Sequence, residues 1–266
     1  MVRSRDGTSI AVFRSGPLDG PPLILVHGAL ADHTTFRVIG PMLATTFAIH
    51  AIDRRGRGAS GDREPYDIER EFEDVASVAE AIAPSGGGGV AVVGHSYGGR
   101  CALGAALLTD AIGIVVSYEG APAPPEAAYG DAPLLDELRS LAAAGDGEGL
   151  IGTFMTRVVG LDAEGLARYR ADPVWPLRVA AAPTVVREMA AEASAAAGLD
   201  RLGGVSVPVL QVLGSDSTSS FAIATRALDA RLADGRVVVI DGARHAAHHT
   251  HPEAVVEAVT MFLGMS

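Results

Sequence analysis

The chain of 266 residues contains no lysine, so all 21 of its basic residues are arginines. This absence excludes a lysine Schiff base and the phosphate-binding lysine of a P-loop. A single cysteine, Cys101, excludes an intrachain disulfide. The amino-terminal residues MVRSRDGTSI contain no apolar stretch of the kind found in a signal peptide. We therefore expect a cytoplasmic protein.

Long apolar runs are also missing, because the longest fall far short of the length that spans a bilayer. Asp and Glu outnumber the basic residues by 32 to 21, and the net charge of −11 repels nucleic acid. With 48% hydrophobic residues and a mean hydropathy of +0.26, the chain is too apolar to be disordered. We expect a soluble globular protein that acts on a small molecule and binds neither nucleic acid nor membrane.

Short aliphatic runs alternate with amphipathic stretches of helical length. The predicted strands are Ile10–Phe13, Leu23–Val26, Phe47–Ile52, Val90–Val93, Ile112–Tyr118, Val207–Leu213 and Val237–Ile240. The predicted helices are Tyr66–Ala83, Gly98–Thr109, Ser219–Ala233 and Pro252–Leu263. This alternation is typical of the α/β class, with a mostly parallel sheet and helices on both faces.

The alternation stops between Ala121 and Val205, where a proline-rich start leads into a helical pattern without a convincing strand. We predict an α/β core formed by residues 1–120 and 206–266, and a helical cap formed by residues 121–205. The glycine run Gly86–Gly89 is predicted to be a turn, because no Lys-Ser/Thr pair follows it.

The strongest local motif is Gly94-His95-Ser96-Tyr97-Gly98, which follows a predicted strand and precedes a predicted helix. A sharp strand-to-helix turn exposes the serine hydroxyl, and the two glycines leave room for that turn. The amide of Tyr97 then opens a helix, where its N–H can stabilise an oxyanion. Ser96 is therefore the candidate nucleophile.

A second oxyanion donor is expected in the loop that follows the strand Leu23–Val26. The segment His27-Gly28-Ala29-Leu30 must pass close to the nucleophile, and Ala29 is the expected donor, with Leu30 as its neighbouring alternative. His27 is expected to brace this loop rather than to act in catalysis.

The sequence resembles the α/β-hydrolase family over nearly its whole length. The matching motifs, in order, are Asp6-Gly7-Thr8, His27-Gly28, Asp53-Arg54-Arg55-Gly56-Arg57-Gly58-Ala59-Ser60, Gly94-His95-Ser96-Tyr97-Gly98-Gly99 and Gly242-Ala243-Arg244-His245. The resemblance implies an eight-stranded, mostly parallel sheet, a serine-acid-histidine triad in that chain order, and a cap inserted after the sixth strand. The segment Gly56–Gly61 also spells a dinucleotide fingerprint, but Pro65 prevents a helix from starting there.

The general base is expected in the loop after the last strand, and the family pattern carries it onto His245. Three further histidines, His248, His249 and His251, raise the possibility of a metal cluster. No cysteine or carboxylate has matching spacing nearby, so we predict no metal and no cofactor.

The triad acid has two candidates. In the usual family pattern the acid follows the seventh strand, three residues beyond a glycine, but here Ser217 has that position and Asp216 lies one residue early. Some family members take the acid from the end of the sixth strand, where this chain has Glu119. The displaced position of Asp216 slightly favours Glu119, and both residues remain candidates.

Three functions are compatible with these residues. The first is a serine hydrolase that cleaves a small, largely apolar ester, lactone or related carbonyl compound, because many predicted cap residues are apolar. The second uses the same site for C–C bond hydrolysis, or for lyase, cyclase or perhydrolase chemistry. The third is a ligand receptor without activity. Four arginines of the cap could bind a carboxylate, although we expect them on solvated helix faces: Arg157, Arg168, Arg170 and Arg178.

Overall fold

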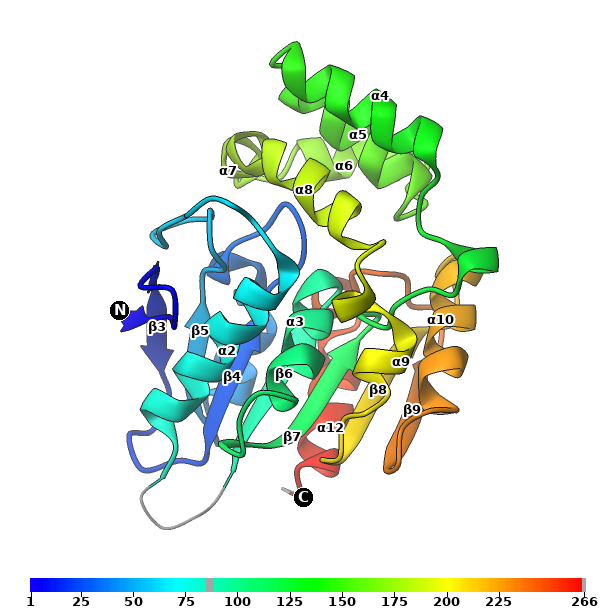
Figure 1. The fold of residues 1–266 in the computed structure, drawn as a ribbon. Helices are drawn as coiled ribbons and strands as arrows, with labels where there is room; N and C mark the ends of the chain where they lie inside the picture. Colours follow the sequence, from blue (N-terminus) through cyan, green and yellow to red (C-terminus); the bar gives the residue numbers. More distant parts are fainter. Residues whose placement is uncertain (85–88, 265–266) are drawn as a thin grey trace.

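A twisted, mostly parallel sheet forms the centre of the computed structural model, which describes residues 1–84 and 89–264 (Figure 1). The strand order is β3-β5-β4-β6-β7-β8-β9, and only β3 runs antiparallel to its neighbour. The strands are β3 (Val12–Ser15), β4 (Pro22–Val26), β5 (Ala48–Ile52), β6 (Val90–His95), β7 (Ile112–Tyr118), β8 (Val209–Gly214) and β9 (Gly235–Ile240). The predicted α/β fold class is confirmed, and each predicted strand has a counterpart.

The expected number of eight strands in one sheet is wrong for the described residues, which place seven in the main sheet. Two short strands, β1 (Val2–Arg3) and β2 (Ser9–Ile10), pair with each other instead. Ala11 lies between β2 and β3, and its amide donates to Ser60 Oγ at 2.8 Å. Residues 86–88 of the predicted glycine turn lie outside the described residues.

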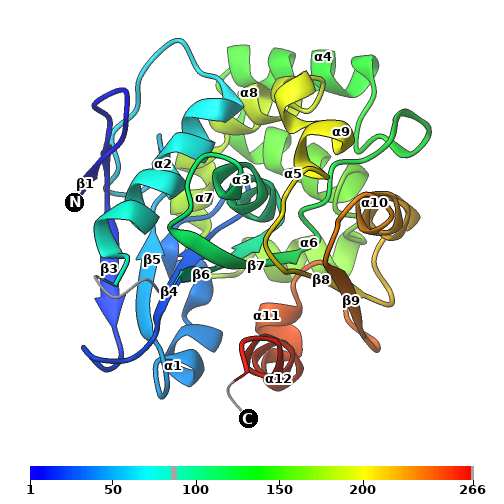
Figure 2. The same ribbon diagram turned by 60° about the horizontal axis from the view of Figure 1, so that its bottom comes forward.

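Helices cover both faces of the sheet (Figure 2). One face carries α2 (Ile68–Ile82), α3 (Tyr97–Ala106), α9 (Leu199–Leu202) and α10 (Ser219–Asp229), and the other carries α1 (Ile39–Leu43), α11 (Ala247–Thr250) and α12 (Pro252–Phe262). Successive residues of one strand divide between the two cores: Ile24 packs with α2 and α3, whereas Leu25 packs with α1 and α12. This alternation follows from the period of two along a strand.

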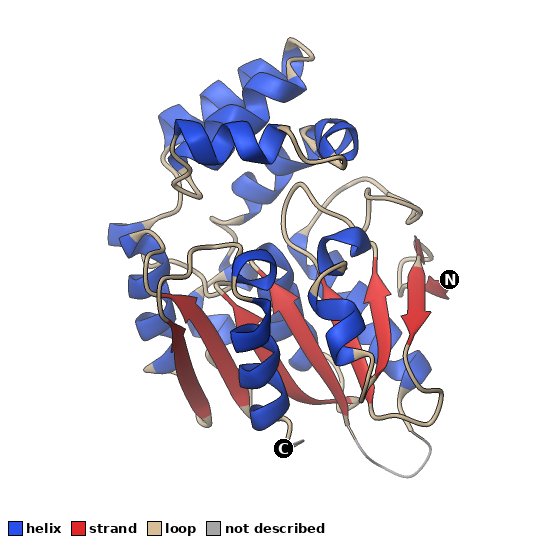
Figure 3. Ribbon diagram, turned by 180° about the vertical axis from the view of Figure 1, so that it is seen from behind, coloured by secondary structure: helices blue, strands red, loops and turns tan. Residues whose placement is uncertain are grey.

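A helical insertion, residues 132–191, connects β7 to β8 and lies over the carboxyl ends of the parallel strands (Figures 1 and 3). It consists of α4 (Ala132–Ala143), α5 (Gly147–Arg157), α6 (Ala163–Arg170), α7 (Trp175–Ala181) and α8 (Pro183–Ala191), between the short 3-10 turns η2 (Pro125–Ala127) and η3 (Ala195–Ala197). The insertion has a hydrophobic core of its own, in which Leu138, Leu150 and Val185 pack with Leu30 of the sheet layer. Its predicted bounds at residues 121 and 205 stay a prediction.

None of the helices in the described part of the chain combines the length and apolarity needed to cross a bilayer. The cytoplasmic location stays a prediction.

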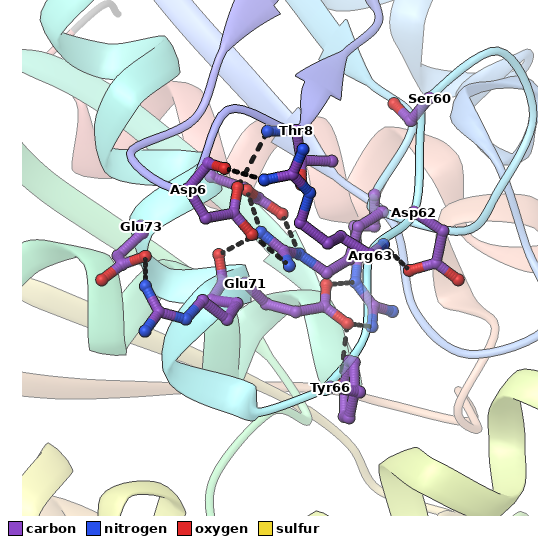
Figure 4. A network of polar contacts seen from close by, with 12 residues as sticks. Asp6, Thr8, Ser60, Asp62, Arg63, Tyr66, Glu71 and Glu73 are labelled. Carbon is purple, nitrogen blue, oxygen red and sulfur yellow. Dashed lines mark hydrogen bonds and ion pairs between the residues drawn. The ribbon is translucent and has the colours of Figure 1, made fainter.

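Two fully buried arginines fix the loop after β5 to α2. Arg54 makes two hydrogen bonds of 2.7 Å to the carboxylate of Glu71, and Arg55 makes two of 2.7 Å to Asp74. Tyr66 donates a further bond of 2.9 Å to Glu71 (Figure 4). Burial alone raises the pKa of Glu71, but the charge and hydrogen bonds of Arg54, together with Arg57 and Tyr66, outweigh burial and lower that pKa to about 2. Both partners are therefore charged in the folded protein at neutral pH.

Replacing Glu71 with glutamine should strongly destabilise the fold, because it removes one of the carboxylates that balance the buried Arg54 charge. Removing one partner of a buried ion pair costs about 3 to 5 kcal/mol of unfolding free energy. The matched control is Glu73→Gln on the same helix, whose partner Arg70 is 44% exposed, and its cost should stay below about 1 kcal/mol. Urea denaturation of both variants measures the difference, and equal costs would contradict the buried pair's importance.

Candidate active site

Backbone strain gathers at the carboxyl edge of the sheet. Among the described residues, three that are not glycine have positive φ: Leu30 at 57°, Ser96 at 54° and Glu119 at 47°. They follow β4, β6 and β7, which are adjacent strands. Such conformations cost free energy and persist only where surrounding structure enforces them, and they cluster at functional sites. The strain therefore marks the place where these three strands end.

The turn at Ser96 depends on close backbone contacts. A Cβ at Gly98 would lie 2.3 Å from the carbonyl oxygen of Val26, and one at Gly94 would lie 2.4 Å from that of Gly98. Neither position can hold a side chain without moving the backbone. The amide of Ser96 donates to the carbonyl of Tyr118 at 2.7 Å, which ties the turn to the neighbouring strand. Ser96 remains partly exposed and lines a cavity.

His245 lies opposite this turn and is held by a buried carboxylate. Its Nδ1 is 2.6 Å from Glu119 Oε2, and the Glu119 side chain is completely shielded from solvent. The other oxygen of Glu119 accepts hydrogen bonds from the Gly214 amide at 2.8 Å and from Ser217 Oγ at 2.6 Å. Ser217 has the position where the usual family pattern has its acid, and here it supports Glu119 instead.

Asp216, the other candidate acid, faces solvent. Its Oδ1 accepts a hydrogen bond of 2.9 Å from Ser215, and its amide donates to the carbonyl of Ala243. No hydrogen bond or ion pair between Asp216 and His245 is present in the described part of the chain. The structure thus brings Glu119 to His245 and leaves Asp216 apart from it.

Two backbone amides near Ser96 are available to a ligand. Within residues 1–84 and 89–264, the N–H groups of Ala29 and Tyr97 donate no hydrogen bond to protein. Tyr97 is the first residue of α3, and both residues line a cavity together with Ser96. Free amides at a helix start favour an anion.

His27 makes the contacts expected of a bracing residue. Burial lowers the pKa of His27 well below its usual value, and the nearby Arg54 charge lowers that pKa further. The neutral ring lies 2.8 Å from the Gly28 carbonyl through Nδ1 and accepts from the Arg54 amide at 2.9 Å through Nε2. It thereby joins the loop after β4 to the loop after β5.

Several contacts around the site were not predicted from the sequence. The ring of Phe221 stacks on that of His245 at 4.5 Å, and His95 Nε2 donates to the His245 carbonyl at 2.7 Å. The Arg54 guanidinium lies 4.6 Å from the centre of the Tyr97 ring and is ion-paired with Glu188 of α8. Arg57 pairs with the same Glu188, so a buried polar contact joins the insertion to the turn that carries Ser96.

A cavity of about 530 Å³ lies between the sheet edge and the insertion. Ala29, Ser96 and His245 line it from the sheet side. Apolar residues of the insertion line it from above: Phe154, Met155, Val159 and Leu161. The same three sheet residues also line a smaller adjacent cavity, of about 40 Å³. A small organic molecule can therefore reach Ser96 and His245 together.

Potential metal ligands gather away from these two residues. Among the described residues, Asp32, His33 and Asp53 form the one group of three whose ligand atoms lie within 4.8 Å of one another. Asp53 Oδ1 already accepts from the amide and ring of His33, and its Oδ2 accepts from the Ala59 amide. Internal hydrogen bonds thus account for this cluster, and we assign no metal to it.

The buried histidines make stability depend on pH. Burial lowers the pKa of His95 well below its usual value, as does the neighbouring His245, and burial together with His95 does the same for His248. A histidine whose folded pKa is depressed binds its proton more readily when unfolded. Stability is therefore present above the unfolded pKa of about 6.5 and is lost as pH falls below that value.

We expect the unfolding free energy to decline between pH 7.5 and pH 5, by up to about 1.4 kcal/mol per pH unit below 6.5 for each such histidine. His248→Gln should make this decline shallower, because the variant removes one of the groups that must stay neutral. The control His251→Gln, at a partly exposed position, should keep the wild-type slope. Urea titrations at five pH values test this, and an unchanged slope in His248→Gln would refute the assignment.

Comparison with known proteins agrees with this fold. Residues 23–258 match the model of the alpha/beta hydrolase family. A 2-(acetamidomethylene)succinate hydrolase of Mesorhizobium japonicum is 28% identical, with 92% of this chain and 88% of that protein covered. A pimeloyl-[acyl-carrier protein] methyl ester esterase of Aeromonas hydrophila is also 28% identical, covering 96% and 100%. The crystal structure of an alpha/beta hydrolase from Sphaerobacter thermophilus superposes with a TM-score of 0.81 at 30% identity, covering 97% of this chain and 99% of that one.

Proposed function

The chain belongs to the alpha/beta hydrolase family and is a hydrolase, and from this premise we propose that it cleaves carboxylic esters through a serine nucleophile. The observation that carries the proposal is the buried Glu119–His245 hydrogen bond of 2.6 Å at a cavity that Ser96 also lines. In this arrangement the carboxylate holds the imidazole by its Nδ1–H and leaves Nε2 as the base.

The reaction follows from these positions. Ser96 Oγ attacks the ester carbonyl while His245 Nε2 takes its proton, and Glu119 stabilises the imidazolium that forms. The amides of Ala29 and Tyr97 donate to the oxyanion, whose negative charge develops at the start of α3. His245 then gives the proton to the leaving alcohol, and a water that His245 deprotonates releases the acid from Ser96.

The helical insertion acts in this proposal as a cap that shapes the substrate site. Its residues Phe154, Met155 and Val159 line the larger cavity, which supports an apolar body for the substrate. Relatives named as a succinate-derivative hydrolase and a methyl ester esterase support hydrolysis of a carbonyl compound. We favour an ester over an amide as the first substrate class to test, and place the protein in the cytoplasm.

A fluorophosphonate probe tests the nucleophile. We expect stoichiometric labelling of the wild type and none of Ser96→Ala, because the probe reacts only with an activated serine. The control Ser219→Ala changes an exposed serine and should label like the wild type. A burst of p-nitrophenolate from p-nitrophenyl esters then reports an acyl-enzyme, which separates ester hydrolysis from C–C cleavage or lyase chemistry. A folded wild type that neither labels nor hydrolyses esters would exclude the proposal.

The two candidate acids can be separated by isosteric amide variants. Glu119→Gln should lower kcat by about three to four orders of magnitude, because the imidazole loses its orienting carboxylate and the counter-charge to its protonated form. Asp216→Asn should keep kcat within about twofold, because among the described residues its side chain bonds only to Ser215. Steady-state kinetics on one p-nitrophenyl ester, with thermal unfolding to verify that both variants fold, measures this. The reverse ranking would make Asp216 the acid.

A further inference from the structure

Arginines outnumber carboxylates in the lining of the larger cavity, although the protein as a whole is acidic. Four arginines line it against two aspartates, whereas the whole chain has a net charge of −11. The arginines are Arg37, Arg168, Arg178 and Arg244, and the aspartates are Asp162 and Asp172. A cavity with an excess of one sign attracts ligands of the other sign.

Two of the arginines share a single carboxylate. Arg37 Nη2 lies 2.7 Å from Asp172 Oδ2, and Arg178 Nη2 lies 3.3 Å from the same oxygen. Arg37 follows the 3-10 turn η1 (His33–Phe36) of the α/β body, whereas Arg178 belongs to α7 of the insertion. Asp172 neutralises one guanidinium, so one positive charge in this group has no counter-charge within it.

Arg178 is held in place before any ligand arrives. Its side chain is only 9% exposed, its Nη1 donates to the Tyr169 carbonyl at 3.0 Å, and its guanidinium lies 3.8 Å from the centre of the Tyr169 ring. A buried, immobilised guanidinium loses little further entropy when it binds a carboxylate. The other arginines are more exposed, with side-chain exposures of 41% for Arg37, 68% for Arg168 and 57% for Arg244. Arg168 and Arg244 also have carboxylate partners of their own, Glu164 and Asp162. Their contribution is weakened by solvent.

We propose that the substrate carries a carboxylate that binds Arg178 and Arg37 in place of Asp172, while its ester carbonyl lies at Ser96. This inference rests on the proposed function and adds a charged end to the otherwise apolar substrate. The planar fork of a guanidinium matches a carboxylate. The substrate class is then a monoester of a dicarboxylic acid whose methylene chain contacts Phe154, Met155 and Val159.

Two esters of equal chain length separate the charged end from the rest of the substrate. Mono-p-nitrophenyl glutarate carries the carboxylate, and p-nitrophenyl valerate has a methyl group in its place. We expect the wild type to prefer the glutarate ester. In Arg178→Gln, kcat/KM for the glutarate ester should fall by about tenfold to a hundredfold, the value of a charge-assisted contact. For the valerate ester it should change less than about twofold.

Asp172→Asn gives a prediction of opposite sign. It removes the carboxylate that competes with the substrate, so kcat/KM for the glutarate ester should rise while that for the valerate ester stays constant. If Asp172 were important only for structure, its replacement would lower kcat/KM for both esters. The matched control is Arg157→Gln, an arginine of the same insertion that pairs with Glu137 outside the lining of the described cavities. Arg157→Gln should leave kcat/KM for both esters unchanged.

Binding of glutarate itself separates this inference from the proposed activity. Calorimetry should detect glutarate binding to the wild type, tighter binding to Asp172→Asn and at least tenfold weaker binding to Arg178→Gln. Glutarate binding with this pattern in a protein that fails to label at Ser96 would uphold the carboxylate site and overturn the esterase proposal. The carboxylate site would be overturned by an active wild type that prefers the valerate ester. It would also be overturned if Arg178→Gln lowered kcat/KM equally for both esters. A preference for inorganic phosphate over glutarate would overturn it as well.

Discussion

The close approach of three backbone segments around Ser96 is the constraint on which the site depends. Strand β6, the start of α3 and the loop after β4 come so near one another that Gly28, Gly94 and Gly98 have no room for a Cβ. Only this crowding keeps Ser96 at a φ of 54°, because an isolated chain would relax from it. The same approach brings the amides of Ala29 and Tyr97 to one cavity. The strained serine and the two free amides therefore arise from a single packing arrangement.

Buried arginines connect this packing arrangement to the helical insertion. Arg54 lies against the Tyr97 ring, holds Glu71 of α2 and pairs with Glu188 of α8, so one side chain joins three layers. A planar guanidinium with five donors can satisfy several carboxylate and carbonyl oxygens at once, which the single ammonium of lysine does less well. The exclusive use of arginine in this chain suits a protein whose buried contacts require forked donors.

Local sequence determined the parts of the fold that repeat with a fixed period. Hydrophobic runs such as Ile112–Tyr118 predicted the strands, and the glycines around Ser96 predicted the turn, because both depend on neighbouring residues. The partner of His245 could not be predicted in this way. Glu119 follows β7 and Ser217 follows β8, so their hydrogen bond of 2.6 Å forms only when the two strands lie side by side in the sheet. Sequence spacing alone left Asp216 almost as good a candidate.

The charged residues of the insertion also show what the sequence alone could not predict. A helical pattern gives the spacing of Arg168 and Arg178 but not which of them faces solvent, and here Arg178 is buried whereas Arg168 is exposed. Burial changes the role of the residue, because a shielded guanidinium interacts strongly with a nearby carboxylate. Asp172 provides that carboxylate and limits the cost of burying the Arg178 charge next to Arg37, whose side chain is 41% exposed. A substrate carboxylate must displace Asp172 from the two arginines, so binding replaces one ion pair with another. The exchange therefore adds little affinity, but it discriminates between charged and uncharged substrates.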